Sequence, residues 1–167
     1  RNPGFGPGGP PPEWKPPMAD TSWVKRKFLD IPYGKESSRQ CLDLYLPDQG
    51  KGPFPLFIHI HRGGVAFGDK RDDHMNAYLE GIKRGYAVAS IEYRVSGEAV
   101  FPAAVLDCRE AVRYIKLHAA EYHVDANHIA VLGGSAGGNL AAMIGMNVPN
   151  GAFPGEEGRT FPVEPNV

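Results

Sequence analysis

Segment 133–137, Gly-Gly-Ser-Ala-Gly, places a serine between glycines two residues to either side. The spacing matches the pattern G-x-S-x-G, and a buried strand is predicted directly before it and a helix directly after it. A strand that turns sharply into a helix holds the serine in a strained conformation, and side chains at the two flanking positions would collide across the turn. The pattern predicts Ser135 as a nucleophile at the carboxyl end of a sheet, where open α/β folds bind ligands. The alternative is a structural serine, a small residue tolerated at a crowded turn.

A serine that attacks a carbonyl carbon creates a tetrahedral oxyanion, so the site must also hold hydrogen-bond donors that are in place before the reaction. The N–H of Ala136 lies at the predicted start of a helix, where the macrodipole favours negative charge. Further donors are expected from a loop after an earlier strand, and segment 59–69, HIHRGGVAFGD, supplies Gly63 and Gly64 there. Ser135, Gly63, Gly64 and Ala136 are therefore the predicted catalytic residues.

The elements that must position these residues follow from the hydropathy pattern. Two short alternating segments predict an antiparallel strand pair at a sheet edge, three apolar segments predict buried parallel strands, and three periodic segments predict helices. The strand segments are 23–34, 39–47, 54–61, 86–93 and 128–133, and the helical segments are 72–86, 102–124 and 136–146. Their order predicts a doubly wound, mostly parallel α/β sheet with antiparallel edge strands and right-handed crossovers.

The 167 residues are enough for one domain with a core, and we find no internal repeat. Residues 1–22 are rich in proline and glycine and are interpreted as an extended arm, with a linker, a strap on the domain surface and a polyproline II ligand as alternatives. Residues 23–167 are the predicted domain, and the pattern becomes loop-like after Asn147.

A formal net charge of -1 argues against a nucleic-acid or anionic-membrane surface, because both require a concentrated basic field. No apolar run approaches the roughly 20 residues of a membrane-spanning helix. We expect a small-molecule partner, no cofactor and no metal, since His59, His61 and His74 lack a carboxylate at ligand spacing. Cys41 and Cys108 are interpreted as small buried residues rather than a disulfide.

Three segments, in this order, carry a resemblance to a known family: HRGG at 61–64, EYRVSGEAVFPAAVLDC at 92–108 and VDANHIAVLGGSAGGNLAA at 124–142. Residues 24–146 resemble the hormone-sensitive-lipase-like and carbohydrate-esterase-like branches of the α/β-hydrolase superfamily. The resemblance implies that Ser135 is the nucleophile of a carboxylic-ester hydrolase working by acyl-enzyme transfer, with the amides of Gly63, Gly64 and Ala136 as its oxyanion hole. It also implies that His61 braces the oxyanion loop and that Tyr93 and Arg94 are structural neighbours of the site.

The first strands and the arm most resemble secreted bacterial acetylxylan or feruloyl esterases. This likeness suggests acetyl or feruloyl esters of plant polysaccharide as substrates and a secreted or periplasmic location. Location is otherwise left open, because composition does not decide it.

Two departures from the family pattern affect the expected site. The family usually has H-G-G-G followed by an aromatic residue, whereas this chain has Arg62 at the first of those glycines and Val65 at the aromatic position. Arg62 adds bulk and a fixed charge, and we favour a partly compensated natural variant or an introduced change over a reader of acidic substituents.

The second departure concerns the base. In this superfamily the acid and the histidine follow the serine, but no histidine follows Ser135, and the acids there are Glu156, Glu157 and Glu164. Asp107 is expected to bond locally within its helix rather than act as the acid. We therefore expect an incomplete α/β-hydrolase fold whose remainder comes from a continuation or a companion chain, and which alone is nearly inactive and poorly folded. A non-catalytic ligand-binding relative and an amidase or peptidase on the same scaffold remain alternatives.

Overall fold

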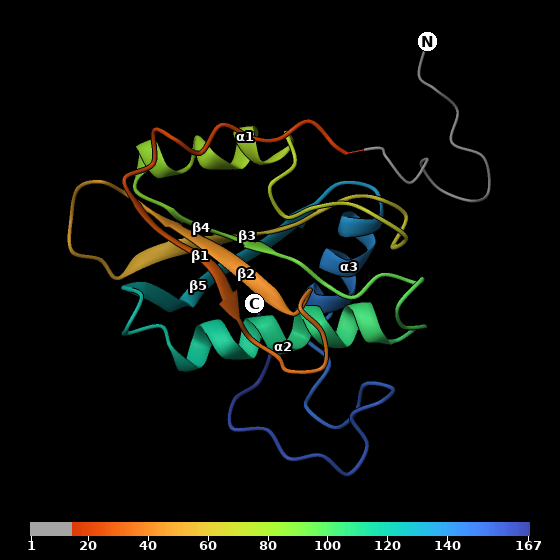
Figure 1. Ribbon diagram of the computed structural model, residues 1–167. Coiled ribbons are helices and arrows are strands. Elements are labelled where there is room, and N and C mark those ends of the chain that lie inside the picture. The colour runs from red at the N-terminus through yellow and green to blue at the C-terminus, as the bar shows by residue number, and fades with distance from the viewer. Residues whose placement is uncertain (1–14) are drawn as a thin grey trace.

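A mixed sheet with helices on both faces organises residues 15–167, the part of the chain that the computed structural model describes (Figure 1). Its five strands lie in the order β1-β2-β4-β3-β5. β1 (Arg26–Pro32) and β2 (Cys41–Leu46) are antiparallel, and β2 also pairs antiparallel with β4 (Ala87–Ile91). β3 (Phe54–Ile60) lies parallel between β4 and β5 (Val124–Gly133). The predicted α/β class with an antiparallel edge pair is confirmed.

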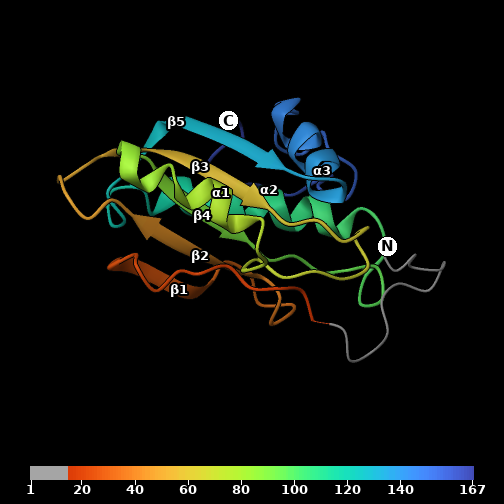
Figure 2. The same cartoon turned by 90° about the horizontal axis from the view of Figure 1, so that it is seen from above.

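The helices divide between the two faces of the sheet. α1 (Met75–Leu79) and the 3-10 turn η1 (Ile82–Arg84) cover one face, and α2 (Ala103–Leu117) and α3 (Ala136–Gly145) cover the other (Figure 2). The single helix expected at 72–86 is divided into α1 and η1. Glu80 and Gly81 keep right-handed helical dihedrals, but the hydrogen bonds there join residues three apart, and Gly85 ends η1 in a left-handed conformation with φ 86°. Within residues 15–167, no helix combines the length and apolarity that crossing a bilayer requires.

Side-chain alternation along the strands builds two cores. Leu56, Ile58 and Ile60 of β3 pack toward α2 and α3, together with the predicted α2 stripe of Val105, Cys108, Val112 and Ile115, all of which are buried. A smaller cluster beneath α1 contains Met75, Leu79 and Val88. All five residues of β4 are buried, as expected for a central strand. Both cysteines are free, and Cys108 is buried.

The prediction that β5 is buried on both faces is wrong. Leu132 is 39% exposed, and His128 and Ala130 are also exposed. β5 is exposed because it is the last strand of the described sheet and pairs only with β3 there. Its apolar composition resembles that of a central strand, but no described element covers its outer edge.

The predicted N-terminal arm lies partly outside the described residues, which begin at residue 15. Met18 forms an isolated antiparallel bridge with Asp72, and the N–H of Ala19 donates to the carbonyl of Arg71 at 2.8 Å. Residues 17–19 thus lie against the segment that precedes α1.

Glycines bring the start of α3 against the end of β3. A Cβ on Gly137 would lie 2.0 Å from the carbonyl oxygen of Ile60 and 2.7 Å from that of His61. A Cβ on Gly133 would lie 2.4 Å from the carbonyl carbon of Gly137, across the turn. The expected collision of side chains at the two flanking positions is confirmed.

Residues 148–167, the C-terminal segment, contain no helix or strand, as predicted, but a buried ionic cluster ties them to α2. Glu156 is fully buried and accepts hydrogen bonds from Arg109 Nε at 2.8 Å and Arg113 Nη2 at 2.5 Å. Arg109 and Arg113 are themselves buried, and Arg109 Nη1 has no hydrogen-bond partner among the described residues. The sequence analysis did not anticipate this cluster.

Gly137→Ala is expected to destabilise the protein by about 3 kcal/mol or more, because the new methyl group meets backbone that cannot rotate away. Gly145→Ala on the same helix is the control, since its Cβ meets nothing within 4 Å. That change is expected to be neutral or to stabilise by up to about 1 kcal/mol. Urea unfolding of both variants tests the close approach, and equal stability would contradict it.

Glu156→Gln is expected to cost about 3 kcal/mol, because it removes the one acidic partner that the described residues give the buried Arg109 and leaves Arg113 with Glu110 alone. Glu157→Gln is the matched control, because Glu157 is exposed and bonds only the N–H of Gly155. It is expected to change stability by less than about 0.5 kcal/mol. A similar loss in both variants would show that the cluster does not anchor the C-terminal segment.

The same cluster predicts an acid limit of stability. Burial alone would raise the pKa of Glu156, but hydrogen bonds from Arg109 and Arg113 outweigh it and lower the pKa from 4.5 to about 2. A carboxyl group whose pKa is lower in the folded than in the unfolded state stabilises the fold at a pH above its unfolded-state pKa. That contribution is lost as the pH falls toward the folded-state pKa. Unfolding free energy should therefore decrease between pH 4.5 and about 2, and less steeply in Glu156→Gln.

Candidate active site

Ser135 lies at the reversal between β5 and α3, in segment 133–137, which we call the elbow. Its backbone has φ 53° and ψ -123°, a conformation that costs a non-glycine residue about 1–3 kcal/mol. The residue is exposed, and its hydroxyl neither caps α3 nor bonds any other described residue. A serine retained as a helix cap would bond the backbone of the first turn. The hydroxyl is therefore accessible to a ligand.

The loop after β3, residues 61–68, lies beside the elbow, and we call it the oxyanion loop after the role predicted for it. Ile60 is the Cα partner of Gly133, so the segments that follow these two strands leave the same end of the sheet side by side. Gly63 and Gly64 have φ values of 128° and 63°, which side chains rarely allow. No oxygen within residues 15–167 accepts a hydrogen bond from the N–H of Gly63, Gly64 or Ala136. The predicted site residues thus meet at one end of the sheet with three unpaired donors.

His61 connects the oxyanion loop to the end of β4. Its Nε2 lies 2.8 Å from Glu92 Oε1, its Nδ1 lies 2.7 Å from the carbonyl oxygen of Arg62, and its ring stacks on Tyr93 at 4.2 Å. Tyr93 Oη donates to the carbonyl oxygen of His61 at 2.8 Å. These contacts fix both the ring and the backbone of His61.

Glu92 is a buried carboxylate that sequence reasoning missed, although it opens segment 92–108. Burial raises its pKa, but the hydrogen bond and charge of His61, the charge of Arg39 and the N–H of Lys70 outweigh burial and hold the pKa below its ordinary value. Its position directly after a buried strand, beside Tyr93, was the feature of the sequence that could have predicted its burial near the site.

Arg62, the departure from the family pattern, has its charge compensated. Its Nη2 lies 3.0 Å from Asp73 Oδ1, and its Nε lies 3.4 Å from Asp72 Oδ2. Its φ is not among the positive values of the described residues, so an ordinary side chain fits there. Val65 does have a positive φ of 59°, and its carbonyl accepts from Ser96 N–H at 2.6 Å.

The expectation that Asp107 bonds locally is wrong. Its carboxylate is buried and accepts from Arg94 Nη2 at 2.7 Å, from the Arg94 N–H at 2.9 Å and from Gln40 Nε2 at 2.8 Å. Arg94 also pairs with Glu36. Asp107 therefore links α2 to the segment after β4 and to the β1–β2 turn, because its donors come from Arg94 and Gln40, which are 13 and 67 residues away in sequence.

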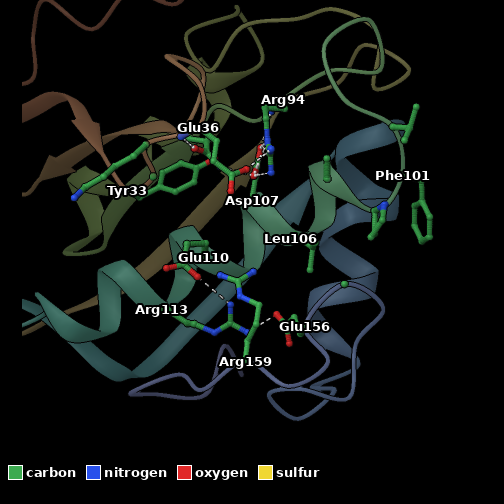
Figure 3. Close-up of a pocket in the computed structure, with 17 residues that line it drawn as sticks. Tyr33, Glu36, Arg94, Phe101, Leu106, Asp107, Glu110, Arg113, Glu156 and Arg159 are labelled. Carbon is green, nitrogen blue, oxygen red and sulfur yellow. Dashed lines mark hydrogen bonds and ion pairs between the residues drawn. The ribbon is translucent and has the colours of Figure 1, made fainter.

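These ion pairs line a pocket of about 540 Å³ between the β1–β2 turn, α2 and the C-terminal segment (Figure 3), and Ser135 is not among its lining residues. In Figure 3, Arg94 and Asp107 form one polar wall, and Arg113 and Glu156 form another. The exposed apolar residues Val100 and Phe101 also line it.

The histidines considered as metal ligands have other environments. His59 is buried, its Nδ1 lies 2.8 Å from Ser90 Oγ, and burial together with the charges of His61 and His74 lowers its pKa to about 3. His74 is exposed, and its Nδ1 would lie 3.7 Å from a Cβ on Gly134. No three His, Cys, Asp or Glu side chains are arranged to hold a metal within residues 15–167.

Comparison with known proteins places this geometry in a family. The sequence model of the BD-FAE family matches residues 42–164. Esterase LipQ of Mycobacterium tuberculosis is 30% identical over 131 residues, covering 77% of this chain and 31% of LipQ. Esterase LipI of the same organism is 33% identical over 116 residues, covering 70% of this chain and 36% of LipI. The chain thus spans about a third of the length of these curated relatives.

Solved structures of esterases also resemble this chain. A truncated carbohydrate esterase from gut microbiota is similar with a TM-score of 0.68 and 32% identity, covering 80% of this chain and 47% of that one. A bifunctional GH43-CE protein of Bacteroides eggerthii has a TM-score of 0.74 and 30% identity, covering 84% of this chain and 20% of that one. The chain belongs to the BD-FAE family, in the hormone-sensitive-lipase-like esterase branch of the α/β-hydrolases.

Proposed function

We propose that this chain carries the nucleophile and oxyanion hole of a serine carboxylic-ester hydrolase. The observation that carries the proposal is the exposed, unbonded hydroxyl of Ser135 in a strained reversal, beside a loop whose Gly63 and Gly64 amides have no partner. Esterases among the relatives, LipQ and LipI included, support the same chemistry. An unpaired amide is costly in a buried residue such as Gly63, so its retention next to an accessible hydroxyl supports a site that awaits an anionic oxygen.

The reaction follows from these groups. Ser135 Oγ bonds to the ester carbonyl carbon, and the carbonyl π electrons move onto oxygen, where the amides of Gly63, Gly64 and Ala136 donate hydrogen bonds. Collapse of this intermediate breaks the bond to the alcohol, which leaves with a proton, and water then releases the acid by the same route. Residues 136–167 contain no histidine, so we assign the base that takes the Ser135 proton to a continuation of this chain or to a companion chain.

Ser135→Ala is expected to lower p-nitrophenyl acetate turnover by about 10⁴-fold or more in the natural protein that carries this chain, because no acyl-enzyme forms without the hydroxyl. The unchanged protein should label with a fluorophosphonate probe, and Ser135→Ala should not. Ser38→Ala, at an exposed serine of the β1–β2 turn, is the control and should retain both properties.

Unchanged turnover in Ser135→Ala, or no labelling of the natural protein, would contradict the proposal. The second outcome would favour a ligand-binding relative without catalysis. Matched ester and amide substrates separate an esterase from an amidase that uses the same atoms.

The proposed substrates are acetyl or feruloyl esters of plant polysaccharide. Two structural neighbours are named as a carbohydrate esterase and a GH43-CE protein. The pocket of Figure 3 supports the idea, because Phe101 is 70% exposed and lines it together with the planar Arg94–Asp107 pair. Sugar rings pack on aromatic faces, and their hydroxyls bond to planar polar groups.

Phe101→Ala is expected to raise KM for an acetylated or feruloylated xylo-oligosaccharide by about 3- to 10-fold, since one aromatic contact contributes about 1 kcal/mol. Turnover of p-nitrophenyl acetate should not change, because that substrate has no sugar to reach the pocket. Leu117→Ala, an exposed apolar residue at the other end of α2, should leave both substrates unaffected. An unchanged KM for the oligosaccharide in Phe101→Ala would remove the pocket from the substrate site.

A further inference from the structure

We propose that the pocket of Figure 3 is a subsite for a sugar that carries a carboxylate, a uronic acid unit of the substrate chain, and that Arg159 binds this carboxylate. Ser135 does not line the pocket, so the subsite holds a part of the substrate away from the reacting ester. The effect of the subsite on turnover rests on the proposed polysaccharide esterase function. Binding of the acidic sugar does not require the reaction.

Arg159 is a cation in the pocket that has no acidic partner within residues 15–167. Its side chain lines the pocket, and in Figure 3 it lies with Arg113 between α2 and the C-terminal segment. Its guanidinium carbon lies 4.9 Å from the centroid of the Phe161 ring. An aromatic ring does not occupy the guanidinium N–H groups as a carboxylate does, so these donors remain available to a ligand. Arg62 beside the elbow differs, because it is paired with Asp73.

The acids that line the pocket are already paired with other arginines. Glu36 and Asp107 pair with Arg94, Glu110 pairs with Arg113, and Glu156 pairs with both Arg113 and the buried Arg109. Lys35, which also lines the pocket, has no ion pair among the described residues. The lining side chains together with Arg109 therefore carry one positive charge more than they carry negative charges.

This single surplus charge determines which anion the pocket favours. A monoanion neutralises the surplus, whereas a dianion such as a phosphate monoester would also be repelled by the four acids of the walls. A carboxylate matches the planar fork of a guanidinium, which donates two parallel hydrogen bonds to the two carboxylate oxygens. Charge and geometry thus both favour a carboxylate as the partner of Arg159.

The rest of the pocket suits a sugar. Its volume of about 540 Å³ lies within the range of about 300–1,000 Å³ that is typical of small-ligand pockets. Carboxylates such as that of Asp107 have several lone pairs, so they can accept from sugar hydroxyl groups in addition to their arginine. Phe101 is 70% exposed and supplies an apolar ring face. A uronic acid combines hydroxyl groups, an apolar ring face and one carboxylate.

The backbone that carries Arg159 is fixed by the buried ionic cluster beside it. The N–H of Arg159 donates to the carbonyl of Glu156 at 3.0 Å, and Glu156 is fully buried. Gly155 brings the same segment against α2, because a Cβ there would lie 2.9 Å from Leu106 Cδ1. Arg159 is therefore attached to an ordered backbone before a ligand binds, which lowers the entropic cost of binding.

Calorimetric titration of the natural protein carrying Ser135→Ala tests binding without turnover. The probes are a xylo-oligosaccharide with one glucuronic acid branch and the same oligosaccharide without the branch. The acidic probe is expected to bind about 10-fold more tightly, and Arg159→Gln should remove this preference without changing the affinity for the neutral probe. Lys51→Gln, at an exposed lysine of the β2–β3 loop outside the pocket, is the control and should keep the preference.

Equal affinities for the two probes, or a preference that persists in Arg159→Gln, would overturn the proposal. Acetate at the same ionic strength distinguishes a sugar subsite from a site for any carboxylate. Acetate is expected to bind at least about 10-fold more weakly than the acidic probe, because it lacks the sugar contacts. Acetate binding as tight as that of the acidic probe would overturn the assignment to a sugar.

Kinetics of the natural protein with Ser135 intact test the role of the subsite in the reaction. Arg159→Gln is expected to raise KM about 10-fold for an acetylated form of the acidic oligosaccharide with kcat unchanged, because the lost contact serves ground state and transition state equally. Turnover of p-nitrophenyl acetate should not change, whereas a general loss of structure would lower it. An unchanged KM would overturn the role of the subsite in turnover. Absence of fluorophosphonate labelling would instead contradict the proposed function, and the calorimetric result would still decide whether the pocket binds the acidic sugar.

Discussion

The arrangement of the site depends on the contact between the first turn of α3 and the backbone at the end of β3. Gly137 lies where a side chain would overlap the carbonyls of Ile60 and His61, and Gly133 lies where one would overlap Gly137. This contact orders the turn at Ser135 and positions it beside the oxyanion loop. The strained φ of Ser135 is tolerated because packing on both sides determines it, as expected when strain persists at a functional position.

Buried carboxylates provide a second layer of constraint, since each accepts from cations or amides on elements distant in sequence. Glu92 joins the β1–β2 turn to the oxyanion loop, Asp107 joins the same turn to α2, and Glu156 joins α2 to the C-terminal segment. Removing either partner of such a pair costs more than the pair contributes, because the remaining charge stays buried. Loops with few apolar contacts are held at one end of the sheet in this way.

The sequence predicted the parts of this fold that depend on local patterns. Strand alternation, the α2 stripe and the flanking glycines at 133 and 137 are encoded within short segments, so periodicity and steric reasoning were enough. Pairing between distant residues was not predictable. Asp107 was expected to bond within its own helix, and Glu92 was not considered, because their partners are 13 to 67 residues away. The exposure of β5 was also missed, because an apolar strand has the same composition at an edge as in the middle of a sheet.

Unusual backbone conformations and unpaired amides occur where the proposed chemistry would take place. Val65 and Ser135, neither of them glycine, both have positive φ, and both lie in the two segments that converge at the end of the sheet. Three amides there have no partner among the described residues, whereas the His61 ring next to them has a partner on each nitrogen. Unpaired donors retain their geometry only if the backbone that carries them cannot relax to satisfy them. The hydrogen bonds and the aromatic stacking of His61 supply that rigidity. The part of the loop with unpaired amides therefore depends on the fully bonded part beside it.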